Sequence, residues 1–138
     1  MKKSIIFLTS MLLLFLGTTK AQEFNPNKNN YLVFTKNTQQ LKPVLITANE
    51  LSVEDGNQYG EFHIVICGET VTDIVNNSAF NELLLHARNQ NVKVFACGLS
   101  LDQFNVSPDQ LPEDIDTIPN GILYGLQLTR EGFITLTI

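Results

Sequence analysis

Positive charge is scarce in this chain. Its nine Lys and Arg residues are outnumbered by 14 Asp and Glu residues, which gives a formal net charge of −5 at pH 7. Lys2, Lys3 and Lys20 lie in an N-terminal segment that we expect to be cleaved, and losing these three positive charges takes the net charge from −5 to −8. No basic cluster remains to neutralise phosphates. We therefore expect no nucleic-acid partner and no attraction to an anionic membrane surface.

Metal-binding and hydrolytic motifs are also missing. The two cysteines and two histidines show no C-x-x-C or H-x-x-x-H spacing, so we expect no metal site. No Ser-His-Asp arrangement is recognisable, and GETVTD (68–73) is not a phosphate-binding loop. No cofactor is expected. His63 lies within an apolar run and is predicted to be a core residue, whereas His86 is predicted to face solvent from the polar edge of a helix.

The chain lacks an apolar run long enough to span a membrane. The longest candidate, 5–16, falls short of the roughly 20 residues that a spanning helix needs. It follows two lysines and precedes the small residues of 17–21, which is the pattern of a secretory signal peptide. We predict a signal peptide over 1–21, cleaved after Ala21, and a periplasmic or secreted product. No cysteine near the cut indicates a lipid anchor.

Strand and helix patterns alternate along the rest of the chain. We predict a flexible lead-in over 22–30 and one domain over 31–138, long enough to bury one modest core. Apolar runs predict strands at 31–35, 61–67, 92–97 and 133–138. Apolar residues at three- and four-residue spacing predict a helix over 38–54 and a second helix after Ser78, with Thr38 and Ser78 as their N-caps, and a third helix from Ile122. The segment 112–116 is expected to be an acidic loop. This alternation predicts an α/β fold with a mostly parallel sheet and right-handed crossovers.

Each of the two cysteines ends a predicted strand and is followed by a glycine turn. Because ligands bind at the carboxyl ends of strands in open parallel sheets, Cys67-Gly68 and Cys97-Gly98 are expected at one edge of the sheet. Neighbouring strands lie about 4.8 Å apart, and the Cα atoms of a disulfide lie about 5.5 Å apart. The register of the two strands therefore decides whether the thiols touch.

Cys97 is the stronger candidate for chemistry. Backbone donors at the start of the helix expected after Gly98, with Ser100 nearby, favour the thiolate form that acts as a nucleophile. The alternative is that Cys97 is an inert buried residue and that Cys67 packs beside it. A disulfide between them is a third interpretation, because an exported protein meets oxidising conditions.

Three segments resemble the DsrE/DsrF-like sulfur-relay family, in particular its small exported members. They are ITANEL around Asn49, SAFNELLLHARNQNVKVFACGLSL and IPNGILYGLQLTREGFITL, and the match runs from about Tyr31 to Ile138. The resemblance implies a flavodoxin-like three-layer α/β sandwich with a mostly parallel sheet of about five strands, assembled into a homo-oligomer. It also implies a cysteine that carries sulfur as a persulfide, and Cys97 is the matching position.

The chain departs from the family at two positions. The family often has His-Gly after the second strand, where this chain has Cys67-Gly68, and its usual glycine before the cysteine-bearing strand is Asn91 here.

The leading hypothesis is that Cys97 accepts and passes sulfane sulfur, or undergoes another thiol redox step, with a donor or acceptor protein as partner. Gly98 and Ser100 would supply the turn and its donors, and the turn of Pro119, Asn120 and Gly121 would let the backbone approach the pocket. The alternative is a non-catalytic module that binds a small ligand or a partner, in which both cysteines are structural.

Overall fold

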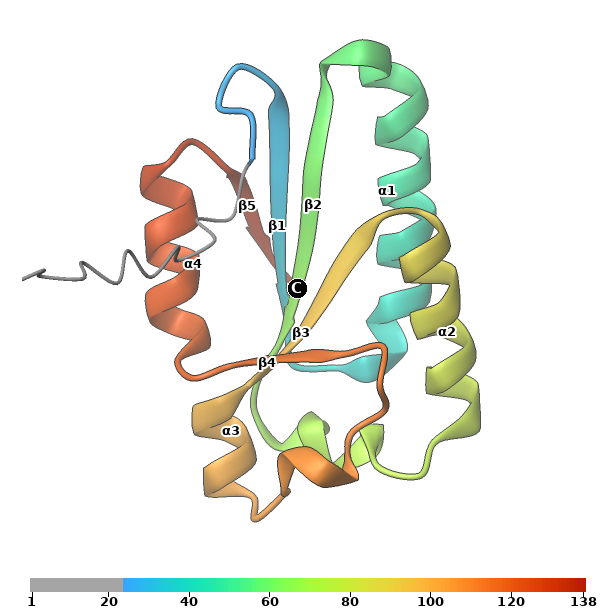
Figure 1. Cartoon of the computed structure of the whole chain (residues 1–138), viewed down its shortest axis with the longest axis vertical. Helices are drawn as coiled ribbons and strands as arrows, with labels where there is room; N and C mark the ends of the chain where they lie inside the picture. The colour runs from blue at the N-terminus through green and yellow to red at the C-terminus, as the bar shows by residue number, and fades with distance from the viewer. Residues whose placement is uncertain (1–23) are drawn as a thin grey trace, which may run out of the picture.

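The computed structural model describes residues 24–138, so the predicted signal peptide lies outside the described residues. Five strands form one sheet in the order β4-β3-β2-β1-β5, and every neighbouring pair is parallel (Figure 1). The strands are β1 (Asn29–Thr35), β2 (Tyr59–Ile66), β3 (Val92–Cys97), β4 (Asp116–Ile118) and β5 (Ile134–Thr137). The prediction of an α/β fold with a mostly parallel sheet of about five strands is confirmed.

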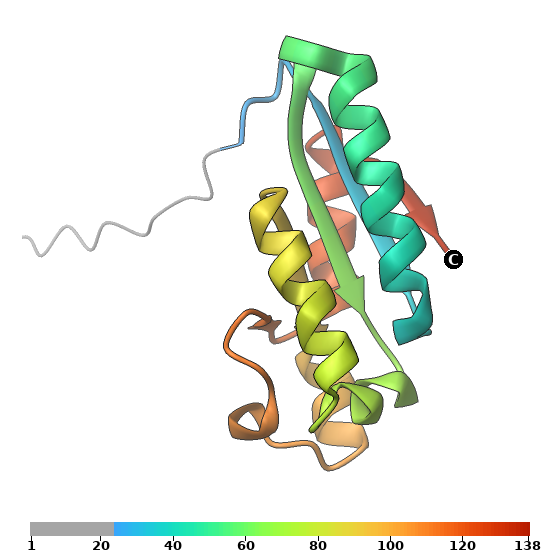
Figure 2. The same ribbon diagram turned by 90° about the vertical axis from the view of Figure 1, so that its right-hand side faces the viewer.

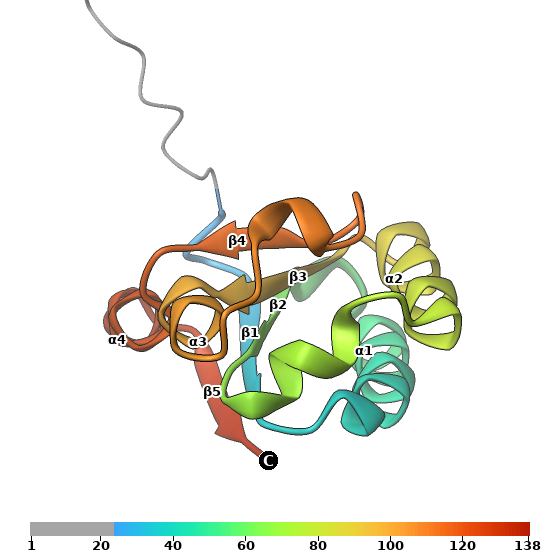
Figure 3. The same cartoon turned by 90° about the horizontal axis from the view of Figure 1, so that it is seen from below.

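Helices cover both faces of this sheet. The four α-helices are α1 (Leu41–Asp55), α2 (Ser78–Asn89), α3 (Gly98–Gln103) and α4 (Gly121–Arg130). α1 and α2 pack side by side on one face and α4 on the other, while α3 lies beyond the carboxyl end of β3 (Figures 2 and 3). The three layers are consistent with a flavodoxin-like fold. Within residues 24–138, no helix combines the length and apolar character needed to cross a membrane.

The strand order explains why α4 is separated from α1 and α2. From β1 to β4 the chain adds strands in one direction, and it then returns through α4 to place β5 at the opposite edge. Crossovers between parallel strands are right-handed. A connection that runs backwards across the sheet must therefore pass over the opposite face.

Side chains in the second half of β2 are buried on both faces, because the strand lies in the middle of the sheet and helices cover each face of it. This central position accounts for its unbroken apolar run. Alternate residues point to opposite faces, so Ile64 and Ile66 pack in the core under α1 and α2, whereas Val65 and Cys67 face α4. Cys97 of β3 faces α4 as well.

The strand β4 was not predicted, because 112–116 was expected to be a loop followed directly by a turn. Asp116–Ile118 instead pairs with β3 at the edge of the sheet. The strand has only three residues, and the first two are exposed. Backbone hydrogen bonds to β3 hold β4 in place, and they do not require the alternation of apolar and polar residues by which a strand is recognised in a sequence.

The first strand begins at Asn29, two residues earlier than predicted. The buried Asn30 side chain explains the difference, because its oxygen accepts a hydrogen bond from the Glu61 N–H at 2.8 Å and so extends the contact with β2. Farther upstream, the ring of Phe24 packs edge-to-face on Phe133, with centroids 5.2 Å apart.

Two helix starts also differ from the prediction. Thr38 begins a short 3-10 helix before α1, and Asn37 caps it. Asn77, not Ser78, caps α2, since its side-chain oxygen accepts from the Phe80 N–H at 3.0 Å. Asn and Ser cap equally well, so local composition did not separate them.

Candidate functional site

Cys67 and Cys97 lie beside each other at the carboxyl edge of the sheet. The register pairs Ile66, the last residue of β2, with Ala96 of β3, and a cysteine follows each of them. Both side chains face α4, and both are free thiols. The prediction that Cys67 and Cys97 lie at the same edge of the sheet is therefore confirmed.

The backbone of Gly121, the first residue of α4, contacts Cys97 directly. Its N–H donates a hydrogen bond to the Cys97 Sγ at 3.4 Å. A Cβ at position 121 would lie 3.1 Å from that sulfur and 3.1 Å from Cγ1 of Val65, so only glycine fits without movement. The predicted close approach of this turn to the cysteine is present.

The turn also packs against the glycine that follows Cys97. A Cβ on Gly98 would lie 2.8 Å from the carbonyl oxygen of Pro119. Asn120 contributes differently, because its side chain caps α4 by accepting from the Leu123 N–H at 3.0 Å. Pro119 and Asn120 thus position α4, and neither supplies a donor to the sulfur.

The surroundings of Cys97 favour its thiolate. Burial alone raises the pKa of the thiol, but hydrogen bonds from the backbone of Ser100 and Gly121, from the Ser100 hydroxyl and from Cys67 outweigh it and lower the pKa. The Ser100 oxygen in turn accepts from the Gly68 N–H at 2.8 Å, which fixes the hydroxyl between the two cysteine turns. A thiolate stabilised in this way is the reactive form of cysteine.

The pKa of Cys67 is shifted in the opposite direction, towards the protonated thiol. Burial raises its pKa to about 12, and the charge and hydrogen bonding of Cys97 add to that effect, while the nearby Lys36 ammonium opposes it. Cys97 therefore ionises first, and Cys67 keeps its proton beside it. The two thiols have different chemical roles although they are neighbours.

Both cysteines line a cavity of about 580 Å³. Leu99, Ile122 and Leu126 form an apolar wall and are themselves partly exposed at the surface, so the cavity opens to solvent. Cys97 is only 2% exposed, and its sulfur is approached from this cavity. Among the described residues that line it, Lys36 alone carries a charge.

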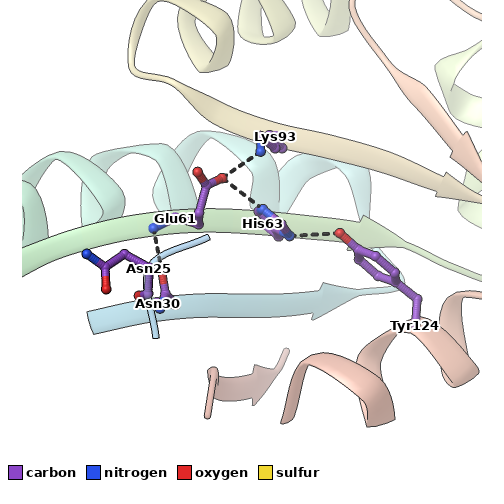
Figure 4. Close-up of polar contacts among 6 residues, drawn as sticks. All are labelled: Asn25, Asn30, Glu61, His63, Lys93 and Tyr124. Carbon is purple, nitrogen blue, oxygen red and sulfur yellow. Dashed lines mark hydrogen bonds and ion pairs between the residues drawn. The ribbon is translucent and has the colours of Figure 1, made fainter. Parts of the chain in front are cut away.

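A partly buried chain of polar side chains, with His63 at its centre, holds α4 against the sheet (Figure 4). The Glu61 carboxylate accepts from Lys93 Nζ at 2.7 Å and from His63 Nε2 at 3.1 Å. With its proton on Nε2, the His63 ring uses Nδ1 to accept from the Tyr124 hydroxyl at 2.9 Å. Burial lowers the pKa of His63 to about 4, so the ring is neutral. Tyr124 lies one helical turn after Gly121, and this chain therefore helps to place the Gly121 donor.

The structure brings together most of the residues selected from the sequence, and it adds others. Lys36 and Tyr124 were not selected, because each reaches the site only through tertiary packing. His63 is a fully buried core residue with both ring nitrogens engaged, as predicted. Within residues 24–138, no cluster of three or more His, Cys, Asp or Glu side chains could hold a metal ion.

Three solved structures share this fold at low sequence identity. MTH1491 from Methanobacterium thermoautotrophicum is 16% identical with a TM-score of 0.67, over 80% of this chain and 100% of that one. BT1422 from Bacteroides thetaiotaomicron is 17% identical with a TM-score of 0.60, over 79% and 95%. The ychN protein from E. coli is 18% identical with a TM-score of 0.57, over 79% and 99%.

These similarities support the fold and do not indicate an activity. MTH1491 and BT1422 are both described as proteins of unknown function. No protein-family model matches the chain, and no curated protein matches its sequence significantly.

Proposed function

We propose that this chain is an exported DsrE-like protein whose Cys97 accepts sulfane sulfur and hands it on. The observation that carries the proposal is the environment of Cys97. Its sulfur faces a solvent-connected cavity and receives hydrogen bonds from Gly121 and Ser100 that favour the thiolate. An inert core cysteine has no need of such donors or of access.

The chemistry requires only the thiolate and a sulfur donor. The Cys97 thiolate attacks the terminal sulfur of a donor persulfide, a new S–S bond forms, and the S–S bond of the donor breaks. The donor leaves as a thiolate, and Cys97 carries the transferred sulfur with its proton. The cavity has room for that added atom and for the approaching donor.

Lys36 suggests what kind of donor the cavity accepts. It is the charged group in a lining whose other side chains are uncharged. An anionic donor, such as a persulfide that also carries a carboxylate, is attracted to this ammonium in an otherwise acidic protein. A protein donor would present its persulfide on a loop that enters the same opening.

A direct test is to incubate the reduced mature protein carrying Cys67→Ser, in which Cys97 is the one remaining thiol, with a small-molecule persulfide and to measure its intact mass. The expected result is a gain of one sulfur atom that is absent when Cys97 is also replaced by serine. A protein that gains no sulfur, or gains it equally without Cys97, would falsify the proposal.

The second candidate is a module that binds a small ligand without chemistry. The low exposure of Cys97 and the apolar wall of the cavity favour it, because these features suit a ligand that is held by packing. The Cys97→Ser variant separates the two functions. It keeps ligand affinity if the cavity only binds, and it loses sulfur acceptance if Cys97 is the acceptor.

We also propose that the mature chain forms a homo-oligomer through α4 and β5. Large apolar side chains are exposed on these two elements and on the residue after β5, namely Ile122, Leu123, Leu126, Ile134, Leu136 and Ile138. β5 is an edge strand with one open side, and a second copy would cover both the strand and the apolar surface. Light scattering after gel filtration measures the mass, and a monomer at all concentrations would contradict this assembly.

Export is part of the same proposal and rests on the signal-peptide pattern of 1–21. Expression of the full chain in a bacterial host, followed by mass measurement of the periplasmic and secreted fractions, tests it. The expected product begins at or within a residue or two of Gln22. Full-length protein retained in the cell would contradict export.

A further inference from the structure

Cys67 has a place in the chemistry beyond packing. It immediately follows β2, and its N–H donates to the Thr35 carbonyl at 3.0 Å, so the backbone there still belongs to the sheet. Cys97 is equally fixed, because it pairs with Ile118 of β4. Two neighbouring strands thus hold the two thiols side by side on the same face.

This arrangement is compatible with a disulfide that forms without backbone movement. Adjacent strands lie about 4.8 Å apart, within the Cα separation of roughly 4.4–6.8 Å that disulfides show. Both thiols are free, and they differ in the ease with which they lose a proton. Such a pair can act as an attacking thiol and a resolving thiol in sequence.

We propose that Cys67 is the resolving thiol of this site: it attacks the persulfide formed on Cys97, releases hydrogen sulfide and leaves a Cys67–Cys97 disulfide. The inference rests on the proposed function, since it begins from sulfur bound to Cys97. It makes the protein a reductase for sulfane sulfur, whose product is sulfide.

The step balances without any other reactant. The sulfur of Cys67 forms a bond to Sγ of Cys97, and the bond between that Sγ and the terminal sulfur breaks. The terminal sulfur leaves with both electrons of the broken bond and takes the Cys67 proton, which gives hydrogen sulfide. Cys67 is oxidised, and the transferred sulfur is reduced.

The cavity and Lys36 both assist this step. Displacement at sulfur requires the leaving atom to point away from the attacker, and the open volume beside Cys97 accommodates it. The stem of Lys36 lies against Gly68, and its positive charge makes the loss of the Cys67 proton easier. Burial, reinforced by the neighbouring Cys97, raises the pKa of Cys67, whereas the pKa of Cys97 is lowered, so Cys97 is the thiol that attacks the donor first.

A dithiol or monothiol reductant must then reopen the disulfide. Two thiols of the reductant are oxidised to a disulfide, and Cys67 and Cys97 each regain a proton. Each cycle therefore consumes one persulfide and two reducing thiols, and it liberates the donor thiol and one sulfide.

The test uses reduced mature protein, freed of reductant and mixed with one equivalent of cysteine persulfide. Sulfide release is measured together with the intact mass and the number of thiols that can be alkylated. We expect the wild type to release about one equivalent of sulfide and to lose both alkylatable thiols. Cys67→Ser is expected to hold one extra sulfur on Cys97 and to release none. The Cys67→Ser/Cys97→Ser double variant gives the background.

The outcomes separate this inference from the function on which it rests. A wild-type protein that keeps its persulfide as long as Cys67→Ser does, with no sulfide above background, overturns the resolving role and leaves sulfur acceptance intact. Failure of folded Cys67→Ser to take up sulfur refutes acceptance itself. Cys67→Ala serves as a second variant if serine disturbs the buried position, and thermal unfolding shows whether each variant is folded.

Discussion

The Gly121 N–H is the backbone donor whose contribution to Cys97 can be removed most cleanly. Proline is unsuitable here, because its Cδ would occupy the place of the hydrogen that points at the sulfur. Replacing the amide by an ester, with glycolic acid at position 121, deletes the N–H and adds no side-chain atom. The protein with glycine at this position is the matched control, because it keeps the donor.

The size of the effect follows from the bond that is lost. Hydrogen bonds to charged groups contribute about 1.5–3 kcal/mol. The N···S distance of 3.4 Å places this bond at the lower end, and a loss of about 1.5 kcal/mol makes the thiolate roughly tenfold less favoured. A more basic thiolate is also more nucleophilic, so the rate constant of the thiolate rises by about threefold when its population falls by about tenfold. The pKa of Cys97 rises, and its reactivity changes in opposite directions below and above that pKa.

The assay is the rate of alkylation of Cys97 by iodoacetamide as a function of pH, in a Cys67→Ser background so that one thiol reacts. At low pH we expect the ester at position 121 to make Cys97 react about threefold more slowly than the matched amide does, and at high pH about threefold faster, so the two profiles cross. Coinciding profiles from two folded variants would show that the Gly121 donor does not stabilise the thiolate, and the reasoning about the site would be wrong.

Three further predictions concern the groups around this donor. Ser100→Ala removes both the acceptor of the Gly68 N–H and a donor to Cys97. The variant should lower the free energy of unfolding by about 1 kcal/mol and slow the alkylation of Cys97 at low pH. An unchanged pH profile of alkylation would count against the role of Ser100. Tyr124→Phe removes the hydroxyl that donates to Nδ1 of the buried His63 at 2.9 Å. The free energy of unfolding measured in urea should fall by about 1–3 kcal/mol, and a variant as stable as the wild type would contradict this prediction. The pKa of His63 is about 4 in the folded protein and ordinarily 6.5. Between those pH values the unfolded chain binds a proton that the folded chain does not, so the free energy of unfolding should fall by about 3 kcal/mol from pH 6.5 to 4. His63→Leu should flatten that part of the stability profile, and an equal slope in the variant would refute the assignment.

The position of the two cysteines could be predicted because it depends on local signals. Each apolar run stops at a Cys-Gly pair, and parallel strands end at a common edge, so the sequence pattern was sufficient to bring Cys67 and Cys97 together. Their exact neighbours depended on the register, which the pattern did not contain. The structure supplies it by pairing Ile66 with Ala96.

Other parts of the site could not be predicted, because the contacts join residues far apart in the chain. Tyr124 and His63 are 61 positions apart, and nothing near either residue indicates the other. Lys36 follows β1 and reaches the cavity only because β1 lies next to β2. β4 was missed for a related reason, since its three residues are held by the backbone of β3 and not by their own side chains.

The account depends most on the ability of Cys97 to hold and release sulfane sulfur. The most direct measurement loads the Cys67→Ser variant with isotopically labelled sulfur from a persulfide, removes the donor and then adds an acceptor thiol. We predict one labelled sulfur per chain, mapped to the peptide that contains Cys97, and its transfer to the acceptor with recovery of the free thiol. A chain that binds no label, or binds it just as well when Cys97 is replaced by serine, would contradict the account.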